Sequence, residues 1–405
     1  MVCGHLEEVR EEKVLEKEEQ TEGQRPFHYS VSAMTPWWIV SVPWHVFVIA
    51  FVGLISMSKL SLGAEASNVI VPPYNAVDEA LCWLAKHQEK DGHWDSVKYN
   101  GKKIDTANTG LALLAFLGVG HTEKVGEYKD HVRRAVAWLK SKQATNGLIF
   151  DNTDEDINRG IGYPGVIATL ALTEATGMAN IADTRDAAQK AVNYYCDVHQ
   201  EGVESDKVSG GYTEKLLSDI SMTGWFVMAL KSAKVAGLQV NPASFESALK
   251  FLIKVEIKNA ESSAYGPASR YCHKSGDTPN PRCGAIGSLI RQFLGERKEN
   301  LQSSVELFIK DGGVPAWGAN GENVDFYYWY FGKRCVCQQS GDVRKRWNDG
   351  MNKALTENQC KQGDDKGSWN PVGEYSLDWG RVGQTALGVL CLNKCCRSFR
   401  LQPYK

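Results

Sequence analysis

Two aspartates precede apolar helical stretches and are the residues best placed to do chemistry. Asp219 comes two positions before Ser221, and Asp325 opens the run Asp325-Phe-Tyr-Tyr-Trp-Tyr330. A carboxylate in such a position can transfer a proton or orient a polar group of a ligand. Because Asp is also a preferred helix N-cap, the alternative is that both residues only cap the helices that follow. The sequence therefore offers Asp219 and Asp325 as catalytic candidates and leaves capping open.

Cationic and aromatic residues occur at corresponding positions of other helical stretches. Helix N-termini favour anions, so Arg282 and Arg381 can hold a phosphate or a carboxylate there. An aromatic wall suits a prenyl or sterol-like chain or a carbohydrate ring, although runs of Tyr and Trp are also typical of packed cores. The ligand-binding candidates are Tyr163, Ser221, Trp225, Arg282, Tyr327, Tyr328, Trp329, Trp379 and Arg381.

A repeated helical unit positions these residues. It consists of an amphipathic helix, a Gln, a Gly turn and a closing aromatic residue, as in Trp83…Gln88…Gly92…Trp94. The six closing aromatics lie 52 to 62 residues apart, at Trp94, Phe150, Tyr212, Tyr265, Trp317 and Trp369. The Gln residues are expected to be structural, satisfying helix-end carbonyls under the aromatic ring.

A second, more apolar helical pattern lies within each interval of the repeat. These patterns cover 106–117, 164–176, 222–236, 284–294, 326–338 and 382–393. Apolar helices are covered on most sides, whereas the first helix of each pair carries charges on one face. No segment alternates strongly enough to predict a strand. We therefore expect an all-α fold, an (α/α)6 toroid of about twelve helices over residues 74–405, with an open helical array as the alternative.

The repeats resemble those of squalene and oxidosqualene cyclases and of protein prenyltransferase β subunits. Segments 109–118, 167–172 and 223–233, with Asp325–Tyr330 and Gly367-Ser-Trp369, resemble membrane-anchored bacterial proteins with prenyltransferase/squalene-oxidase repeats and no assigned activity. This resemblance implies the toroid fold. It also implies that the N-terminal ends of the inner helices surround the mouth of a central cavity, including Asp105, Tyr163, Asp219, Arg282, Asp325 and Arg381.

The motifs of both related enzyme classes are incomplete. Cyclases of the protonating kind carry D-x-D-D-T, and Asp219-Ile-Ser-Met-Thr223 has Ser221 where the proton-donating Asp should stand. Prenyltransferases bind zinc through Asp, Cys and His, and here Ser221 and Tyr328 replace the Cys and the His. Ser and Tyr are poor zinc ligands, so we expect no metal and no cofactor. The acidic Asp154-Glu155-Asp156 is interpreted as a solvated turn.

The N-terminal region has a different composition from the repeats. Residues 1–35 form a charged tail that we expect to be disordered. Residues 36–58 contain no Asp, Glu, Lys or Arg and are Trp-rich at their start; roughly 35 Å of helix would span a bilayer. We predict a single-pass membrane anchor followed by a linker, 59–73. A buried helix, or an export signal cleaved near Ala64-Glu65-Ala66, is the alternative.

Charge and cysteine content restrict the partners. Lys plus Arg number 46 and Asp plus Glu 48, so no basic field favours nucleic acid. Eleven cysteines without a C-x-x-C pair argue against a zinc ribbon. Cys272 and Cys283 could form a disulfide if the toroid is exported, or bind a metal weakly together with His273, but neither is favoured. Export of the toroid itself is slightly favoured. The favoured function is binding of an isoprenoid, lipid or glycan in the cavity. The alternative is an enzyme, a polysaccharide lyase or hydrolase or a prenyl-transfer type, using acids at the inner-helix ends.

Overall fold

Paired helices make up the chain from residue 74 onward. The structure, a computed structural model, describes residues 74–154, 162–204, 219–263, 266–339 and 341–393. These residues all belong to one compact unit. The tail, anchor and linker expected at 1–35, 36–58 and 59–73 lie outside the described residues.

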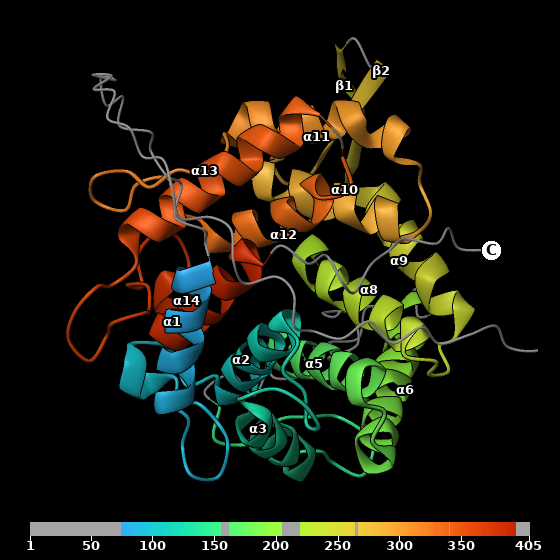
Figure 1. Cartoon of the computed structure of the whole chain (residues 1–405). Coiled ribbons are helices and arrows are strands. Elements are labelled where there is room, and N and C mark those ends of the chain that lie inside the picture. Colours follow the sequence, from blue (N-terminus) through green and yellow to red (C-terminus); the bar gives the residue numbers. More distant parts are fainter. Residues whose placement is uncertain (1–73, 155–161, 205–218, 264–265, 340, 394–405) are drawn as a thin grey trace, which may run out of the picture. The chain divides into compact units, whose positions relative to one another are not determined.

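Six helices form a closed inner ring (Figure 1). Each packs against the next along the chain, and the last packs back against the first. They are α2 (Asp105–Val119), α5 (Tyr163–Ala179), α8 (Ile220–Val235), α10 (Pro281–Phe293), α12 (Phe326–Val336) and α14 (Ser376–Leu392). The contact of α14 with α2 confirms the closed toroid and excludes the open array.

Six further helices lie outside this ring. Each packs against the inner helix that precedes it, with α1 against α14 where the ring closes. They are α1 (Tyr74–Lys86), α3 (Lys129–Ser141), α6 (Ala182–Glu204), α9 (Pro242–Val255), α11 (Lys298–Gly312) and α13 (Asp342–Asn358). The described residues thus contain the twelve helices predicted from the repeat.

Burial explains why the two helix sets differ in composition. Inner helix α8 is buried at every position from Ile220 to Ala233, so its sequence is apolar on all sides. Outer helix α13 buries only Val343, Trp347, Met351, Ala354 and Leu355, a single stripe at helical spacing. Its other faces carry the charges that are exposed to water.

Three glutamines of the repeat join neighbouring repeats. In each, the side-chain amide donates to the carbonyl of its own glycine turn and to a carbonyl of the next outer helix. The bonds run from Gln88 to Gly92 and His131 (both 2.9 Å), from Gln143 to Gly147 and Ala187 (3.1 and 2.8 Å), and from Gln359 to Gly367 and Ala76 (2.8 and 2.7 Å). The last of these joins the sixth repeat to the first.

The closing tryptophans satisfy the helix-end carbonyls that the sequence assigned to Gln. Trp94 Nε1 donates to the Leu84 carbonyl at 2.8 Å, and Trp369 Nε1 donates to the Leu355 carbonyl at 2.9 Å. The turn glycine must also lie close to the next repeat. A Cβ at Gly367, where φ is +92°, would lie 2.2 Å from the Glu79 carbonyl oxygen. Only glycine combines the positive φ with the absence of a Cβ that this close approach requires.

The prediction that the fold contains no strand is wrong. Strands β1 (Glu256–Ser263) and β2 (Gly266–Tyr271) form an antiparallel hairpin between α9 and α10. The register shifts between Ile257 and Glu261, where Asn259 has a φ of +53°. This irregularity interrupts the alternation of side chains, so the sequence carried no period of two.

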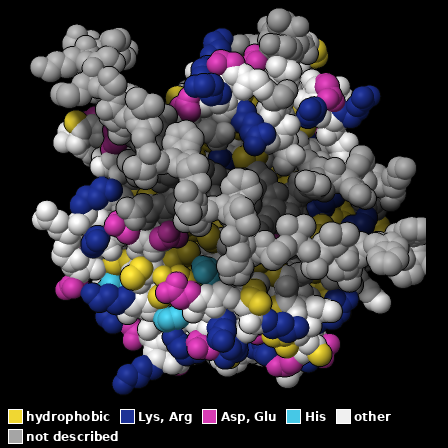
Figure 2. Space-filling view, in the orientation of Figure 1, with side chains coloured by type: hydrophobic (Ala, Val, Ile, Leu, Met, Phe, Trp, Pro, Cys, Tyr) yellow, Lys and Arg dark blue, Asp and Glu magenta, His cyan; other side chains and the backbone are white. Residues whose placement is uncertain are grey.

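The surface carries mixed charge. Figure 2 shows Lys and Arg interspersed with Asp and Glu on the face in view, without a large patch of one sign. In the part of the chain that the structure describes, no helix has the length and hydropathy needed to span a bilayer.

Candidate functional site

The N-terminal ends of the inner helices surround a cavity of about 360 Å³. Such a volume falls within the usual range for small-ligand sites. The wall combines aromatic, charged and small side chains from α2, α5, α8, α10, α12 and α14 and the connections that precede them. It is formed by Lys102, Ile104, Ala107, Tyr163, Pro164, Ser221, His273, Asn280, Arg282, Cys283, Tyr327, Tyr375, Asp378 and Trp379.

Asp219 organises one side of this cavity. It is the N-cap of α8, where its Oδ1 accepts from the Met222 amide at 2.8 Å. The same oxygen accepts from the Tyr163 hydroxyl at 3.2 Å and lies 3.6 Å from His273 Nε2. Tyr163 and His273 both line the cavity. Asp219 is therefore both a helix cap and the residue that holds a tyrosine and a histidine together.

Arg282 is fixed on another side of the cavity. Its guanidinium donates to Asp325 Oδ2 through Nε at 2.9 Å and Nη2 at 2.5 Å, and to Glu374 Oε2 at 2.7 Å. Its Cζ also lies 4.8 Å from the ring centre of Tyr375. Burial lowers the pKa of Arg282, but the two carboxylates outweigh burial and raise it. Asp325 caps α12 through Tyr328 N at 2.8 Å.

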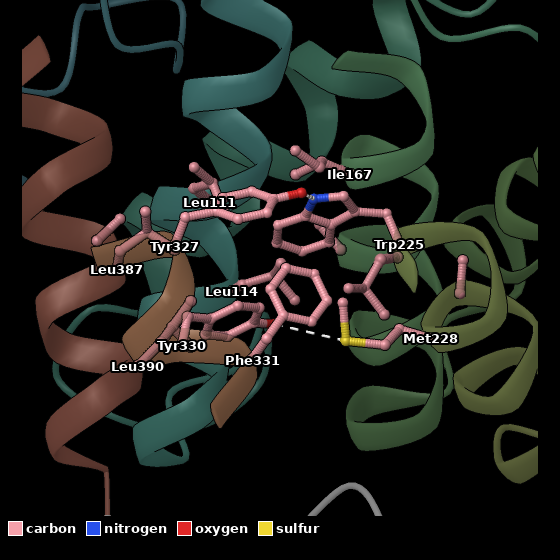
Figure 3. Close-up of a cluster of buried hydrophobic side chains, with 14 of the residues drawn as sticks. Leu111, Leu114, Ile167, Trp225, Met228, Tyr327, Tyr330, Phe331, Leu387 and Leu390 are labelled. Atoms are coloured by element: carbon pink, nitrogen blue, oxygen red, sulfur yellow. Dashed lines mark hydrogen bonds between the residues drawn. The ribbon is translucent and has the colours of Figure 1, made fainter. Parts of the chain in front are cut away.

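An aromatic cluster lies below Tyr327, between the inner helices (Figure 3). The Trp225 indole donates to the Tyr327 hydroxyl at 2.7 Å and stacks on Tyr330 with ring centres 5.3 Å apart. Phe331 and Met228 fill the same space between the inner helices. We call Trp225, Met228, Tyr327, Tyr330 and Phe331 the aromatic plug. Because of this plug the centre of the ring is packed rather than hollow.

A separate pocket of about 200 Å³ lies at the C-terminal ends of the inner helices. Residues such as Leu117, Met178 and Leu390 line it together with Lys333 and Arg334. Arg334 lies over the Tyr330 ring at 4.8 Å. The plug therefore separates two pockets at opposite ends of the inner helices.

The structure brings together five of the nine residues proposed to bind a ligand. Tyr163, Ser221, Arg282, Tyr327 and Trp379 all line the cavity. Of the two acids proposed to be catalytic, Asp219 contacts Tyr163 and His273, and Asp325 contacts Arg282. Their roles in binding and catalysis remain predictions.

The other four residues do not line the cavity, which corrects their expected placement. Trp225 lies in the plug. Tyr328 lies one residue, or about 100°, around α12 from Tyr327, and its hydroxyl donates to the carbonyls of Phe308 and Gly313. Trp329 packs against Trp317 and Phe326. Arg381 follows a break in α14 at Gly380 and donates to Ser368 and Asn370 instead.

The interpretation of Asp154 as a solvated residue is also wrong. Its carboxylate accepts from the amides of Asp105 at 2.9 Å and Thr106 at 3.3 Å, and only 2% of the residue is exposed. Burial raises the pKa of Asp154 to about 6. Asp154 therefore satisfies the N-terminus of α2. Asp105 itself accepts from the Ser96 amide at 2.8 Å and is not in the cavity wall.

Several cavity residues were not singled out as site residues from the sequence. His273 and Asn280 lie in the connection between β2 and α10, which the sequence showed only as a Pro-rich loop with a Cys-His pair. Cys272 and Cys283, considered for a disulfide, are free thiols, and burial raises the pKa of Cys283 to about 11. Within the described ranges, no group of three His, Cys, Asp or Glu side chains is arranged to hold a metal ion.

Solved structures with the same architecture identify the fold. A glycoside hydrolase family 76 mannosidase from Bacteroides thetaiotaomicron matches 79% of this chain and 96% of its own, with a TM-score of 0.53 and 12% identity. An alpha-amylase from Clostridium perfringens matches 79% and 97%, with a TM-score of 0.50 and 14% identity. The chain is an α/α toroid.

Other comparisons add no activity to the toroid. The type II terpene cyclase MstE from Scytonema matches 80% of this chain and 99% of its own, with a TM-score of 0.45 and 13% identity. No protein-family model and no curated protein matches the sequence. At such identities structural likeness shows the fold alone, so function must be argued from the cavity.

Proposed function

We propose that the toroid binds a glycan in the cavity at the N-terminal ends of its inner helices. The observation that supports this is the mixed wall, in which Tyr327 and Trp379 stack with ring centres 6.4 Å apart beside polar groups such as Asn280 and His273. Aromatic faces pack against the apolar faces of sugar rings, and a few placed polar groups bind their hydroxyls.

The geometry favours a glycan over the isoprenoid or lipid considered from the sequence. A long hydrocarbon needs a deep apolar channel, and the aromatic plug occupies that space. In the cavity itself a hydrocarbon would cover the Arg282–Asp325 and Lys102–Asp378 ion pairs. Removing such charges from water without new polar partners is costly. A polyhydroxylated ring supplies those partners.

The names of two structural neighbours, a mannosidase and an alpha-amylase, indicate that those proteins act on glycans. Their identity to this chain is too low to carry an activity. The proposal therefore rests on the cavity wall, and the names only show that this architecture accommodates glycans elsewhere.

Calorimetric titration with neutral and uronate-containing oligosaccharides tests the proposal. We expect Trp379→Ala to weaken binding by roughly tenfold or more, because a stacking surface is lost. The matched control is Trp317→Ala, which removes a partly buried indole outside the cavity and should leave binding unchanged. Equal losses from both variants, or a lipid that co-purifies in native mass spectrometry and is displaced by no glycan, would contradict glycan binding.

A second candidate is an enzyme, favoured by the contact at 3.6 Å between His273, which lines the cavity, and Asp219 behind it. Histidine is a frequent general base or general acid in enzymes, and a carboxylate beside it can orient the imidazole ring. The two candidates differ in one measurement, since an enzyme converts the glycan that it binds.

We also propose that residues 36–58 attach the toroid to a membrane. The support is the uncharged, Trp-rich sequence of this segment. The full chain should sediment with membranes and resist alkaline extraction, whereas a chain lacking residues 36–58 should not. A mature N-terminus near Ala66 would show instead that the segment is a cleaved export signal.

A further inference from the structure

Four side chains of the cavity wall together have the chemistry of a β-elimination. We propose that the toroid cleaves a uronate-containing glycan by β-elimination, with His273 as base, Tyr163 as acid, and Asn280 and Arg282 binding the uronate carboxylate. This inference rests on the glycan site proposed above and adds the substrate class and the reaction.

The reaction needs a base, an acid and donors that neutralise the uronate carboxylate, and it needs no further reactant. The hydrogen on C5 of a uronate is acidified only when the neighbouring carboxylate is neutralised by hydrogen-bond donors or positive charge. His273 takes the C5 proton, and the electron pair forms the C4=C5 bond. The C4–O4 bond then breaks, and the leaving oxygen takes a proton from the Tyr163 hydroxyl. Atoms and charges balance without water, metal or cofactor.

The base and the acid are held close together. Tyr163 Oη and His273 Nε2 lie 3.2 and 3.6 Å from the same oxygen, Asp219 Oδ1, so they are within about 7 Å of each other. Groups this close together can act on neighbouring atoms of one sugar residue. Asp219 caps α8 and does not line the cavity, so it acts as a positioning residue for Tyr163 and His273.

The carboxylate-binding pair begins α10. Asn280 is the N-cap, and its Oδ1 accepts from Cys283 N at 2.9 Å, which directs the Nδ2 amide hydrogens elsewhere. Arg282 follows two residues later with its guanidinium fixed by Asp325 and Glu374. The partial positive charge of the helix N-terminus adds to both. A carboxylate at this point meets an amide, a guanidinium and a helix end.

The protonation state of Tyr163 suits an acid. Burial, and then the nearby Tyr327 and Asp219, raise the pKa of Tyr163 well above its ordinary value. Its phenol therefore keeps its proton until an alkoxide forms beside it. In the structure this proton is donated to Asp219 Oδ1, so it must turn from Asp219 to the leaving oxygen during the reaction.

The same wall argues against hydrolysis. Glycoside hydrolases commonly use two opposed carboxyl groups. Asp378 is the one carboxylate in the described cavity wall, and Lys102 pairs with it. An elimination needs no second carboxylate, so it fits the residues present.

The test is incubation of the full chain with alginate, polygalacturonate and hyaluronan, with mannan and amylose as neutral controls. The C4=C5 bond of the product absorbs in the ultraviolet, and mass spectrometry shows chain cleavage without addition of water. We expect product from at least one uronate polymer and none from the neutral ones. His273→Ala and Tyr163→Phe should each lower the rate by roughly a hundredfold or more while changing affinity by less than about threefold.

Matched variants separate chemistry from folding. Tyr328→Phe removes a buried hydroxyl outside the cavity and should leave the rate unchanged. Asn280→Asp keeps the cap oxygen but places a negative charge against the uronate, so uronate binding should fall while neutral glycan binding persists. Binding of uronate polymers without unsaturated product overturns the elimination and leaves the glycan site standing. Full activity in both His273→Ala and Tyr163→Phe overturns the assigned roles, and failure to bind any glycan overturns the site itself.

Discussion

Replacement of Asp325 measures how much of the cavity's architecture depends on one carboxylate. Asp325→Ala removes the cap of α12, which is worth about 1 kcal/mol. It also leaves Arg282 with Glu374 as its carboxylate partner, and the Glu374 side chain is 63% exposed. Breaking a fully buried ion pair costs about 3 to 5 kcal/mol, and this pair is partly exposed, so about 2 kcal/mol is expected. The free energy of unfolding should fall by about 3 kcal/mol.

Asp325→Asn separates the two contributions. Its amide oxygen can still accept from Tyr328 N, so about 2 kcal/mol should be lost through the charge alone. Urea unfolding followed by circular dichroism gives both values. Asp349→Ala, which removes an exposed pair with Lys345, is the control and should cost less than about 0.5 kcal/mol. A loss below 0.5 kcal/mol for Asp325→Ala, or no difference between Asn and the native residue, would refute the assignment of Asp325 as cap and partner of Arg282.

Three further predictions follow from burial and packing. Asp154 has a pKa of about 6 in the folded chain against about 4 unfolded, so the folded state binds the extra proton between these values. Stability should therefore fall by about 2 kcal/mol as pH rises from 4 to 6 relative to Asp154→Asn, and a difference that does not vary with pH would contradict this. Trp225→Ala should cost about 3 to 5 kcal/mol in urea unfolding, because it removes a wholly buried indole from the plug; a loss under 1 kcal/mol would show that the plug collapses freely. Gly367→Ala should destabilise more than Gly363→Ala, since only at Gly367 does a Cβ meet backbone of the next repeat; equal midpoints would contradict that close approach.

The repeat was sufficient to predict the fold from the sequence, but it did not predict which side chains at the inner-helix ends point into the cavity. Helix pairing follows from the spacing of Gln, Gly and aromatic residues, and acids before apolar helices necessarily lie at one end of the ring. One residue along α12 turns a side chain by about 100°, which separates Tyr327 in the cavity from Tyr328 in the outer packing. The break at Gly380 similarly redirects Arg381. Neither effect leaves a periodic signal.

Long-range contacts account for the remaining differences. His273 reaches the cavity because the β1–β2 hairpin returns the chain beside Asp219, and this hairpin has no alternating pattern. Asp154 is buried because it meets the N-terminus of α2, which is 48 residues away in the chain. In both cases the residue's surroundings come from another part of the chain, so its local sequence looks like that of an exposed loop.

The hydrogen bonds of Gln359 have a consequence for how the chain may be cut. They join the sixth repeat to the first in the same way as Gln88 joins the first to the second. The junction between α14 and α1, which no short connection links, therefore has the same hydrogen bonds as the junction between the first and second repeats. A circular permutant that begins at α3, with α14 linked to α1, should form the same set of contacts. In that sense the order of repeats around the ring is fixed, whereas the place where the polypeptide starts is arbitrary.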